Sequence, residues 1–315
     1  MKKAVHFLAG IFFGGIFVLV QIALFNILIP LNNSQEKTIF HIEKGEGSEK
    51  IAMYLEEEGI IRSSAVFRLY VLATGLSRNL KAGDYELSSS MNVASIAGKI
   101  VSGDIAKETL TIIEGWSRKD IAQYLQEKGI PHGKDLEGSS YAELEGYLFP
   151  DTYTVRKGAD LKEVIALMRD TFDTKITQEM KDQALSDGRS FKDIITMASL
   201  IEKEVRIIDD KRIASGILWK RLEIGMPLQV DATITYVTGN AKVSVADTKI
   251  DSPYNTYQYR GLPAGPIANP GIESIQAALN PEATSYLYYL STPEGKTVFN
   301  RTLQEHNEAK AEHLR

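Results

Sequence analysis

The chain has 315 residues, of which 43% are hydrophobic and 24% are charged, an ordinary balance for a folded protein and too apolar for a disordered one. Its formal charge of −5 argues against a nucleic-acid partner, because phosphate backbones are held by clustered lysines and arginines. The chain contains no cysteine, which excludes thiolate catalysis, disulfide scaffolds and cysteine-ligated zinc together.

The amino-terminal segment predicts a membrane anchor. Residues 4–31 contain no Asp, Glu, Lys or Arg, and as a helix they would extend about 42 Å, against the roughly 30 Å of a bilayer hydrocarbon core. A secretory signal peptide is the alternative, but the apolar run is about twice the usual length and no small-x-small cleavage pattern follows it. With Lys2 and Lys3 inside, residues 1–33 are expected to form a cytoplasmic N-terminus and a single transmembrane helix of the cell membrane, and all later residues are extracytoplasmic.

An internal repeat follows the anchor. Residues 51–60 (IAMYLEEEGI) and 121–130 (IAQYLQEKGI) are identical at seven of ten positions, at an offset of 70. Each copy follows an extended stretch and a glycine, carries one apolar helical stripe, and ends at a glycine suited to a helix C-cap. The unit resembles half of a LysM module, a small carbohydrate-binding fold, although two packing units could also share such a common pattern. We expect residues 34–108 to form a LysM-like α/β subdomain.

The rest of the chain predicts a mixture of helices and short strands. Capping-box spacing at Asp160 with Glu163 and at Ser190 with Asp193 predicts two helix starts. Periodicity predicts helices over 63–74, 160–172, 190–205, 209–222, 273–279 and 303–314, and strands over 81–87, 286–290 and 296–299, with an irregular stretch after 225. We therefore expect an α+β fold in which residues 109–315 form a larger mixed α+β catalytic domain.

Several common catalytic and cofactor-binding motifs are absent from the sequence. It has no G-x-S-x-G, H-E-x-x-H, P-loop or dinucleotide glycine motif, and its five histidines are scattered. A histidine-ligated metal or a Ser-His relay is therefore not expected, and carboxylates remain as the acid and base groups. No cofactor is predicted.

Glu145 is the first candidate carboxylate. It lies in the apolar and aromatic run LEGYLFPDTY, residues 144–153. A carboxyl group held among such side chains loses hydration of its charged form, so its pKa would rise and it could donate a proton near neutral pH. The alternative is an exposed glutamate at a turn before a strand.

Glu202 is the second candidate. Helical periodicity places it on the apolar side of the helix FKDIITMASLIEKEV, where a carboxylate needs a partner or lines a wet cleft. An ion pair with Arg206 or Arg212 is the alternative. Glu204, on the opposite side near Asp193, is expected to be solvated.

A third region combines amide, tyrosine, glycine and proline residues. It comprises residues 227–236 (PLQVDATITY) and 251–271 (DSPYNTYQYRGLPAGPIANPG). Sugars present apolar ring faces and hydroxyl edges, which aromatic platforms and amide groups suit. The region predicts a sugar-binding surface, and a structural Ω-loop is the alternative.

At these residues the sequence resembles the endolytic murein transglycosylase family, also called MltG or YceG-like. The matching segments follow the family order: EGYLFPDTY at 145–153, ITMASLIEKEV at 195–205, GMPLQVDATITY at 225–236 and SPYNTYQYRGLPAGPIANPG at 252–271. Leu148 and Val205 depart from the aromatic and the Thr or Ser of other members, but the acidic positions are intact.

The resemblance implies a lytic transglycosylase that cleaves the MurNAc-GlcNAc bond within peptidoglycan strands and leaves a 1,6-anhydroMurNAc end. Glu145 would be the catalytic acid and then the base, without a metal or cofactor. The implied cleft residues are Glu202, Gln229, Asp231, Asn255 and Tyr257. The implied partners are glycan strands and cell-wall synthases. Two alternatives stay open: a non-catalytic peptidoglycan-binding scaffold, and a two-carboxylate muramidase that uses Glu202 or Asp231 as the second carboxylate.

Overall fold

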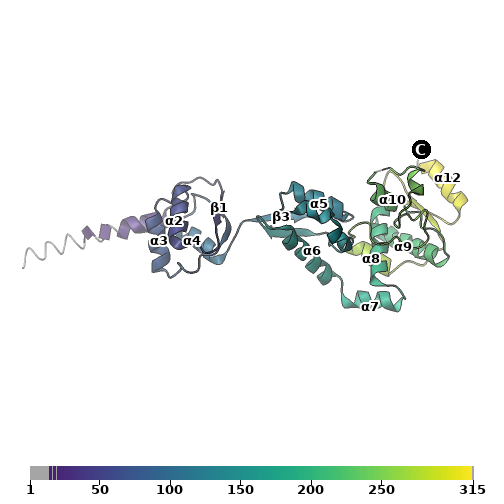
Figure 1. Ribbon diagram of the computed structural model, residues 1–315, viewed down its shortest axis with the longest axis horizontal. Coiled ribbons are helices and arrows are strands. Elements are labelled where there is room, and N and C mark those ends of the chain that lie inside the picture. Colours follow the sequence, from purple (N-terminus) through teal and green to yellow (C-terminus); the bar gives the residue numbers. More distant parts are fainter. Residues whose placement is uncertain (1–13, 16, 19, 241, 314–315) are drawn as a thin grey trace, which may run out of the picture. The chain divides into compact units, whose positions relative to one another are not determined.

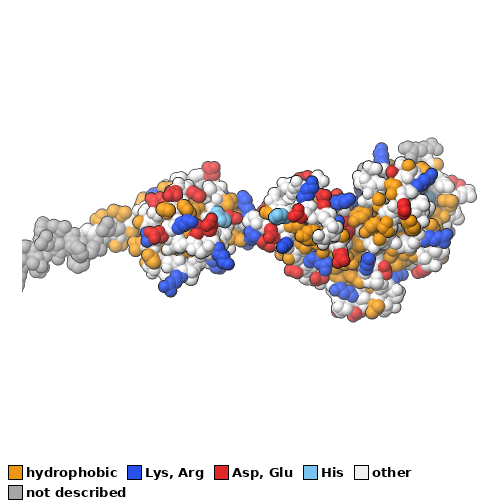
Figure 2. All heavy atoms as spheres, in the orientation of Figure 1, with side chains coloured by type: hydrophobic (Ala, Val, Ile, Leu, Met, Phe, Trp, Pro, Cys, Tyr) orange, Lys and Arg blue, Asp and Glu red, His pale blue; other side chains and the backbone are white. Residues whose placement is uncertain are grey.

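The structure is a computed structural model that describes residues 14–313 except 16, 19 and 241. The chain divides into two compact units: residues up to 108 together with 155–158, and residues 109–154 together with 159–315. Each unit has its own hydrophobic core. Acidic and basic side chains are interspersed on the visible face of each unit (Figure 2), as on a solvated protein surface.

Part of the predicted membrane anchor is described. Residues 20–28 are helical, and apolar side chains such as Phe25 and Leu28 are exposed. In the described ranges, no helix has both the length and the apolar character needed to cross a bilayer. Residues 1–13, 16 and 19, which make up much of the predicted span, lie outside the described residues.

The first unit is built around an antiparallel pair of strands. Its elements are β1 (Thr38–Ile42), α2 (Ser48–Glu57), α3 (Ser64–Ala73), β2 (Gly83–Leu87) and α4 (Val93–Ser102) (Figure 1). Phe40 of β1 lies opposite Tyr85 of β2, and both side chains are fully buried against apolar residues of the three helices. The two strands therefore form one wall of the core and the helices form the other.

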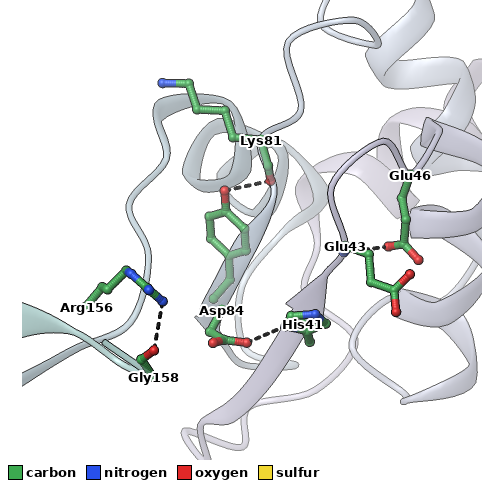
Figure 3. A network of polar contacts seen from close by, with 8 residues as sticks. His41, Glu43, Glu46, Lys81, Asp84, Arg156 and Gly158 are labelled. Carbon is green, nitrogen blue, oxygen red and sulfur yellow. Dashed lines mark hydrogen bonds and ion pairs between the residues drawn. The ribbon is translucent and has the colours of Figure 1, made fainter. Parts of the chain in front are cut away.

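Polar contacts fix the edge of this strand pair (Figure 3). His41 Nδ1 lies 2.7 Å from Asp84 Oδ1 across the two strands. The Tyr85 hydroxyl donates to the Lys81 carbonyl oxygen at 2.8 Å, and so ties the residues before β2 to the strand. The Lys81 backbone contacts Tyr85 and Ile100 instead of β1, so β2 begins at Gly83 and not at the predicted residue 81.

The second unit begins within β3 (Lys107–Thr111), at Thr109, and continues with α5 (Arg118–Glu127). Two 3₁₀ turns follow, η1 (Gly133–Glu137) and η2 (Ser139–Leu144), and then β4 (Thr152–Arg156), which pairs with β3. α2 and α5 occupy corresponding positions of the repeat, and each is followed by a glycine of positive φ, Gly59 or Gly129. The repeated residues therefore form a similar helix in each copy, with the same type of helix end.

The remaining elements of the second unit are mostly helical. They are α6 (Leu161–Lys175), α7 (Gln178–Ser186), α8 (Phe191–Glu204), α9 (Ile208–Glu223), α10 (Asp231–Thr238), η3 (Asp247–Lys249), α11 (Ile272–Leu279), β5 (Tyr288–Ser291), β6 (Thr297–Asn300) and α12 (Leu303–His313). α8 is the central element, since residues 194–201 are all buried and it contacts α7, α9, α10 and α11. Helices with small antiparallel sheets give the α+β class, as predicted.

Candidate active site

Glu145 lies at a sharp turn between η2 and β4. Its backbone ends the 3₁₀ turn, and the next residue, Gly146, has a φ of +85°. A Cβ atom at Gly146 would lie 2.6 Å from Pro266 and 2.8 Å from Ile195, so only glycine fits between these side chains. The turn directs the Glu145 side chain inward, where it is only 4% exposed. This excludes the alternative of an exposed glutamate at a turn.

Three hydrogen bonds hold the Glu145 carboxyl group. Oε1 accepts from the Arg118 backbone N–H at 2.9 Å and from Asn269 Nδ2 at 3.3 Å. Oε2 accepts from the Tyr236 hydroxyl at 3.1 Å. The three donors come from the start of α5, from the loop before α11 and from α10. The carboxyl group is therefore fixed by parts of the chain far apart in sequence.

Burial changes the acidity of this group. It raises the pKa of Glu145 from an ordinary 4.5 to about 7, and the hydrogen bonds from Arg118 and Tyr236 only partly oppose the rise. At neutral pH a large share of the molecules therefore carries the protonated acid. Such a group can donate a proton to an oxygen placed against it.

The Glu145 cavity, as we call the hollow against this carboxyl group, has a volume of about 720 Å³, large enough for a sugar-sized ligand. Its wall comes from η2, α6, α8 and the Pro-Gly loop before α11. The lining residues are Ala142, Glu143, Leu144, Glu145, Tyr147, Arg169, Lys192, Tyr254, Ala264, Gly265 and Pro266.

Glu202 lies outside this lining. Its Oε1 lies 3.2 Å from Lys211 Nζ, and both side chains of the ion pair are buried. Its Oε2 accepts from the Gly271 backbone N–H at 2.9 Å. The ion pair expected as the alternative is thus present, but its cation is Lys211 of α9 instead of Arg206 or Arg212.

Gln229, Asp231 and Tyr257 lie together in a second cavity of about 380 Å³. The Tyr257 hydroxyl donates to Asp231 Oδ1 at 2.5 Å. Glu204 lines the same cavity and is half-buried, contrary to the expectation that it is solvated. Burial, together with the nearby Asp231 charge, raises the pKa of Glu204 to about 7.

In the described part of the chain, no group of three or more acidic or histidine side chains is placed to hold a metal ion.

Asn255 lines neither cavity. Its side-chain amide donates to the carbonyl oxygens of Thr248 and Ile250 at 3.1 and 2.7 Å, and its Oδ1 accepts from the Tyr257 backbone N–H at 2.9 Å. It is fully buried. Its contacts shape the loop that carries Tyr257.

Known proteins are similar to this chain in sequence and in fold. A model of the YceG-like family matches residues 40–312. The chain belongs to the YceG-like family. It is 33% identical over 321 residues to a Bacillus subtilis (strain 168) protein named endolytic murein transglycosylase, and the match covers 92% of this chain and 88% of the relative. A Streptococcus pneumoniae serotype 2 protein of the same name is 28% identical over 354 residues, which cover 97% of this chain and 63% of that protein.

A solved structure of the YceG-like family is also similar to this chain. It is a 2.6 Å crystal structure of a yceG-like protein from Listeria monocytogenes, with a TM-score of 0.56 and 34% sequence identity. The match covers 88% of this chain and 100% of the crystallised one.

Sequence reasoning missed the three residues of this YceG-like site that donate to Glu145, which are Arg118, through its backbone N–H, Asn269 and Tyr236. Asn269 is fully buried and also donates to the Trp116 carbonyl oxygen at 3.0 Å and accepts from the Leu148 backbone N–H at 2.9 Å. Tyr236 ends the segment GMPLQVDATITY, and Asn269 lies in PIANPG, so both belong to segments that were singled out as wholes. Their contacts join residues 91 and 124 positions apart, which no local pattern encodes.

Proposed function

We propose that this chain is an endolytic murein transglycosylase, which cuts peptidoglycan glycan strands between MurNAc and GlcNAc and leaves a 1,6-anhydroMurNAc end. The curated relatives bear that name. The observation that carries the proposal is the buried, raised-pKa Glu145 carboxyl group at the wall of a sugar-sized cavity. A single carboxyl group of this kind suffices for the reaction.

The reaction uses Glu145 twice. In its acid form, Glu145 gives its proton to the glycosidic oxygen, while the C1–O bond of MurNAc breaks with oxocarbenium character. The resulting carboxylate takes the proton of the 6-hydroxyl group, and that oxygen bonds to C1 to close the anhydro ring. No water is consumed, and the acid form of Glu145 is regenerated.

The hydrogen bonds indicate which oxygen carries the proton. Two N–H donors, Arg118 N and Asn269 Nδ2, point at Oε1, so the proton of the acid form resides on Oε2. The Tyr236 hydroxyl, which can donate or accept, contacts Oε2 in either state. The geometry thus supports one carboxyl group that both gives and takes a proton without moving.

The muramidase alternative needs a second carboxylate in the same cavity. Neither Glu202, paired with Lys211, nor Asp231, paired with Tyr257, lines the Glu145 cavity. Glu143 does line it and is exposed, so it is the residue that a hydrolytic reaction would use. This observation keeps hydrolysis as the second candidate function.

Mass spectrometry of the products separates these functions. The purified full chain is incubated with cell-wall sacculi, and the released fragments are weighed. Fragments with anhydro ends are expected. Fragments with reducing ends, which are heavier by one water, would support the muramidase. Sedimentation of the chain with the sacculi, without release of fragments, would support the non-catalytic scaffold.

Glu145→Gln, which keeps both N–H bonds to Oε1, is expected to lower turnover by roughly 10²- to 10⁴-fold. Parent-like release by this variant would contradict the role of Glu145.

The other parts of the chain extend the same proposal. Residues 1–33 anchor the protein by a single transmembrane helix of the cell membrane, so that the enzyme lies on the side where peptidoglycan lies. Residues 34–108, in which the strand-helix-helix-strand order of β1, α2, α3 and β2 is followed by a further helix, α4, act as a LysM-like module that holds glycan. Cell-wall synthases, which produce the strands, are the protein partners. Pull-down of sacculi by a chain that carries His41→Glu at the strand edge, beside Asp84, tests the module when it is compared with the parent.

A further inference from the structure

The Glu145 cavity carries two cations that the proposed reaction does not use. Arg169 projects from α6 and Lys192 from the first turn of α8, and both line the cavity together with Glu145. Two separate helices thus bring positive charge to the place where the substrate would lie.

The Arg169 guanidinium group is held in place by aromatic rings. It lies 5.4 Å from the ring centre of Tyr147, another lining residue, and 5.5 Å from that of Phe172. The attraction between a guanidinium group and a ring face is electrostatic and does not use the N–H donors, which can bind a carboxylate with two hydrogen bonds. The two rings therefore favour this position of the Arg169 side chain and leave its donors available.

Neither cation is taken up by an ion pair in the described part of the chain. Among the ion pairs of the described residues, none involves Arg169 or Lys192. The acidic side chains of the wall are Glu145 and the exposed Glu143. Asp193, beside Lys192, is engaged by its own helix start, where it accepts from Ser190 at 2.7 Å. Two positive charges are thus available to an anionic ligand.

We propose that Arg169 and Lys192 form a subsite for a carboxylate of the murein strand. This inference rests on the proposed function. Each MurNAc bears a lactyl ether at C3 of the ring whose C1–O bond is cleaved. The lactyl carboxyl group is either free, on peptide-free strands, or joined to a stem peptide that carries carboxylates of its own. The shared chemistry is a carboxylate close to the MurNAc ring. A paired arginine and lysine would bind it by charge-assisted hydrogen bonds and so distinguish murein from an uncharged glycan.

The test measures binding in the full chain carrying Glu145→Gln, which separates binding from turnover. Three strand preparations are compared: strands with intact peptides, strands stripped of peptides by an amidase, and intact strands whose carboxyl groups are capped as amides. Three variants are made in this background: the double variant Arg169→Gln with Lys192→Gln, the charge-retaining Arg169→Lys, and the control Lys162→Gln. Lys162 is an exposed lysine of α6 that lies outside the cavity. Lys192 is exposed, so Lys192→Gln alone serves if the double variant fails to fold.

The double variant is expected to raise the Kd for carboxylate-bearing strands by about 10-fold or more and to leave the Kd for capped strands unchanged. Loss confined to stripped strands identifies the lactyl carboxylate, and loss confined to intact strands identifies the stem peptide. Equal loss on capped and uncapped strands, or no loss on either, would overturn the subsite. Release of anhydro ends by the parent chain is scored separately, so failure of the subsite is distinguishable from failure of the proposed function.

Discussion

The acidity of one buried side chain, Glu145, sets the expected pH dependence of the reaction. Because the acid form is required and the pKa is raised to about 7, kcat/KM is expected to be level below that pH and to fall about tenfold per pH unit above it. Initial rates of anhydro-end release across pH 5 to 9, with circular dichroism to monitor folding, measure the profile. An additional acid limb in folded protein would indicate a second, ionised carboxylate.

The same pKa predicts a stability effect with a definite sign. The folded-state pKa of Glu145 lies above its ordinary 4.5, so its contribution to folding is most favourable below pH 4.5 and declines as the pH rises toward 7. Across that window, the parent should lose about 3 kcal/mol of unfolding free energy relative to Glu145→Gln. Urea unfolding of both proteins at pH 4.5, 5.5 and 7 measures the difference. A constant difference would mean that Glu145 is ionised in the folded protein.

At the residue scale, the sequence predicted the burial of Glu145 but not the groups that hold its carboxyl group. The aromatic and apolar neighbours of Glu145 indicate its burial, because they are adjacent in the chain. The expectation that Gln229, Asp231 and Tyr257 share a cleft with Glu145 was drawn from resemblance, and in the structure they line the second cavity. Which side of a loop a polar residue faces depends on tertiary packing, and local composition does not encode it.

The turn that presents Glu145 depends on Gly146. Gly146→Ala places a Cβ atom against Pro266 and Ile195 in a left-handed backbone conformation, so both overpacking and backbone strain apply. We expect a loss of about 2–5 kcal/mol of unfolding free energy. Gly188→Ala is the matched control, since its φ is +71° but nothing lies within 4 Å of its Cβ, and it should cost only about 1–2 kcal/mol. Equal losses in denaturant unfolding would show that Gly146 has no special packing role.

Helix starts were the most predictable elements. Asp160 and Ser190 cap α6 and α8 as their spacing indicates, because a cap is a local hydrogen bond between residues three apart. α10 was not predicted: its sequence DATITYVT is rich in β-branched residues, which disfavour a helix in isolation. Thr233 and Ile234 of α10 are buried in the unit, so packing overrides local propensity there.

At the scale of the whole molecule, the two units have separate cores, which predicts separate unfolding transitions. Phe67→Ala in the first core and Phe172→Ala in the second should each cost about 3–5 kcal/mol. Differential scanning calorimetry should show each substitution lowering the Tm of one transition only. A single transition shifted by both would mean that the units unfold together.

The α+β class and the repeated strand-turn-helix segment were predictable from periodicity alone, since both reflect local patterns of apolar residues. Membership of the YceG-like family, indicated by four ordered segments, is shown by the match over residues 40–312. The division of the chain was harder to predict in detail. Residues 155–158 belong with the first unit, because contacts, and not chain order, define a compact unit.

Titration of the Glu145 carboxyl carbon by NMR measures whether this group retains its proton near neutral pH. The full chain is labelled with ¹³C at the glutamate carboxyl carbons, and the Glu145 signal is assigned by its absence from Glu145→Gln. A midpoint at about pH 7 is expected. A midpoint near the ordinary 4.5 would show that the group is already ionised at neutral pH and would contradict the proposed acid.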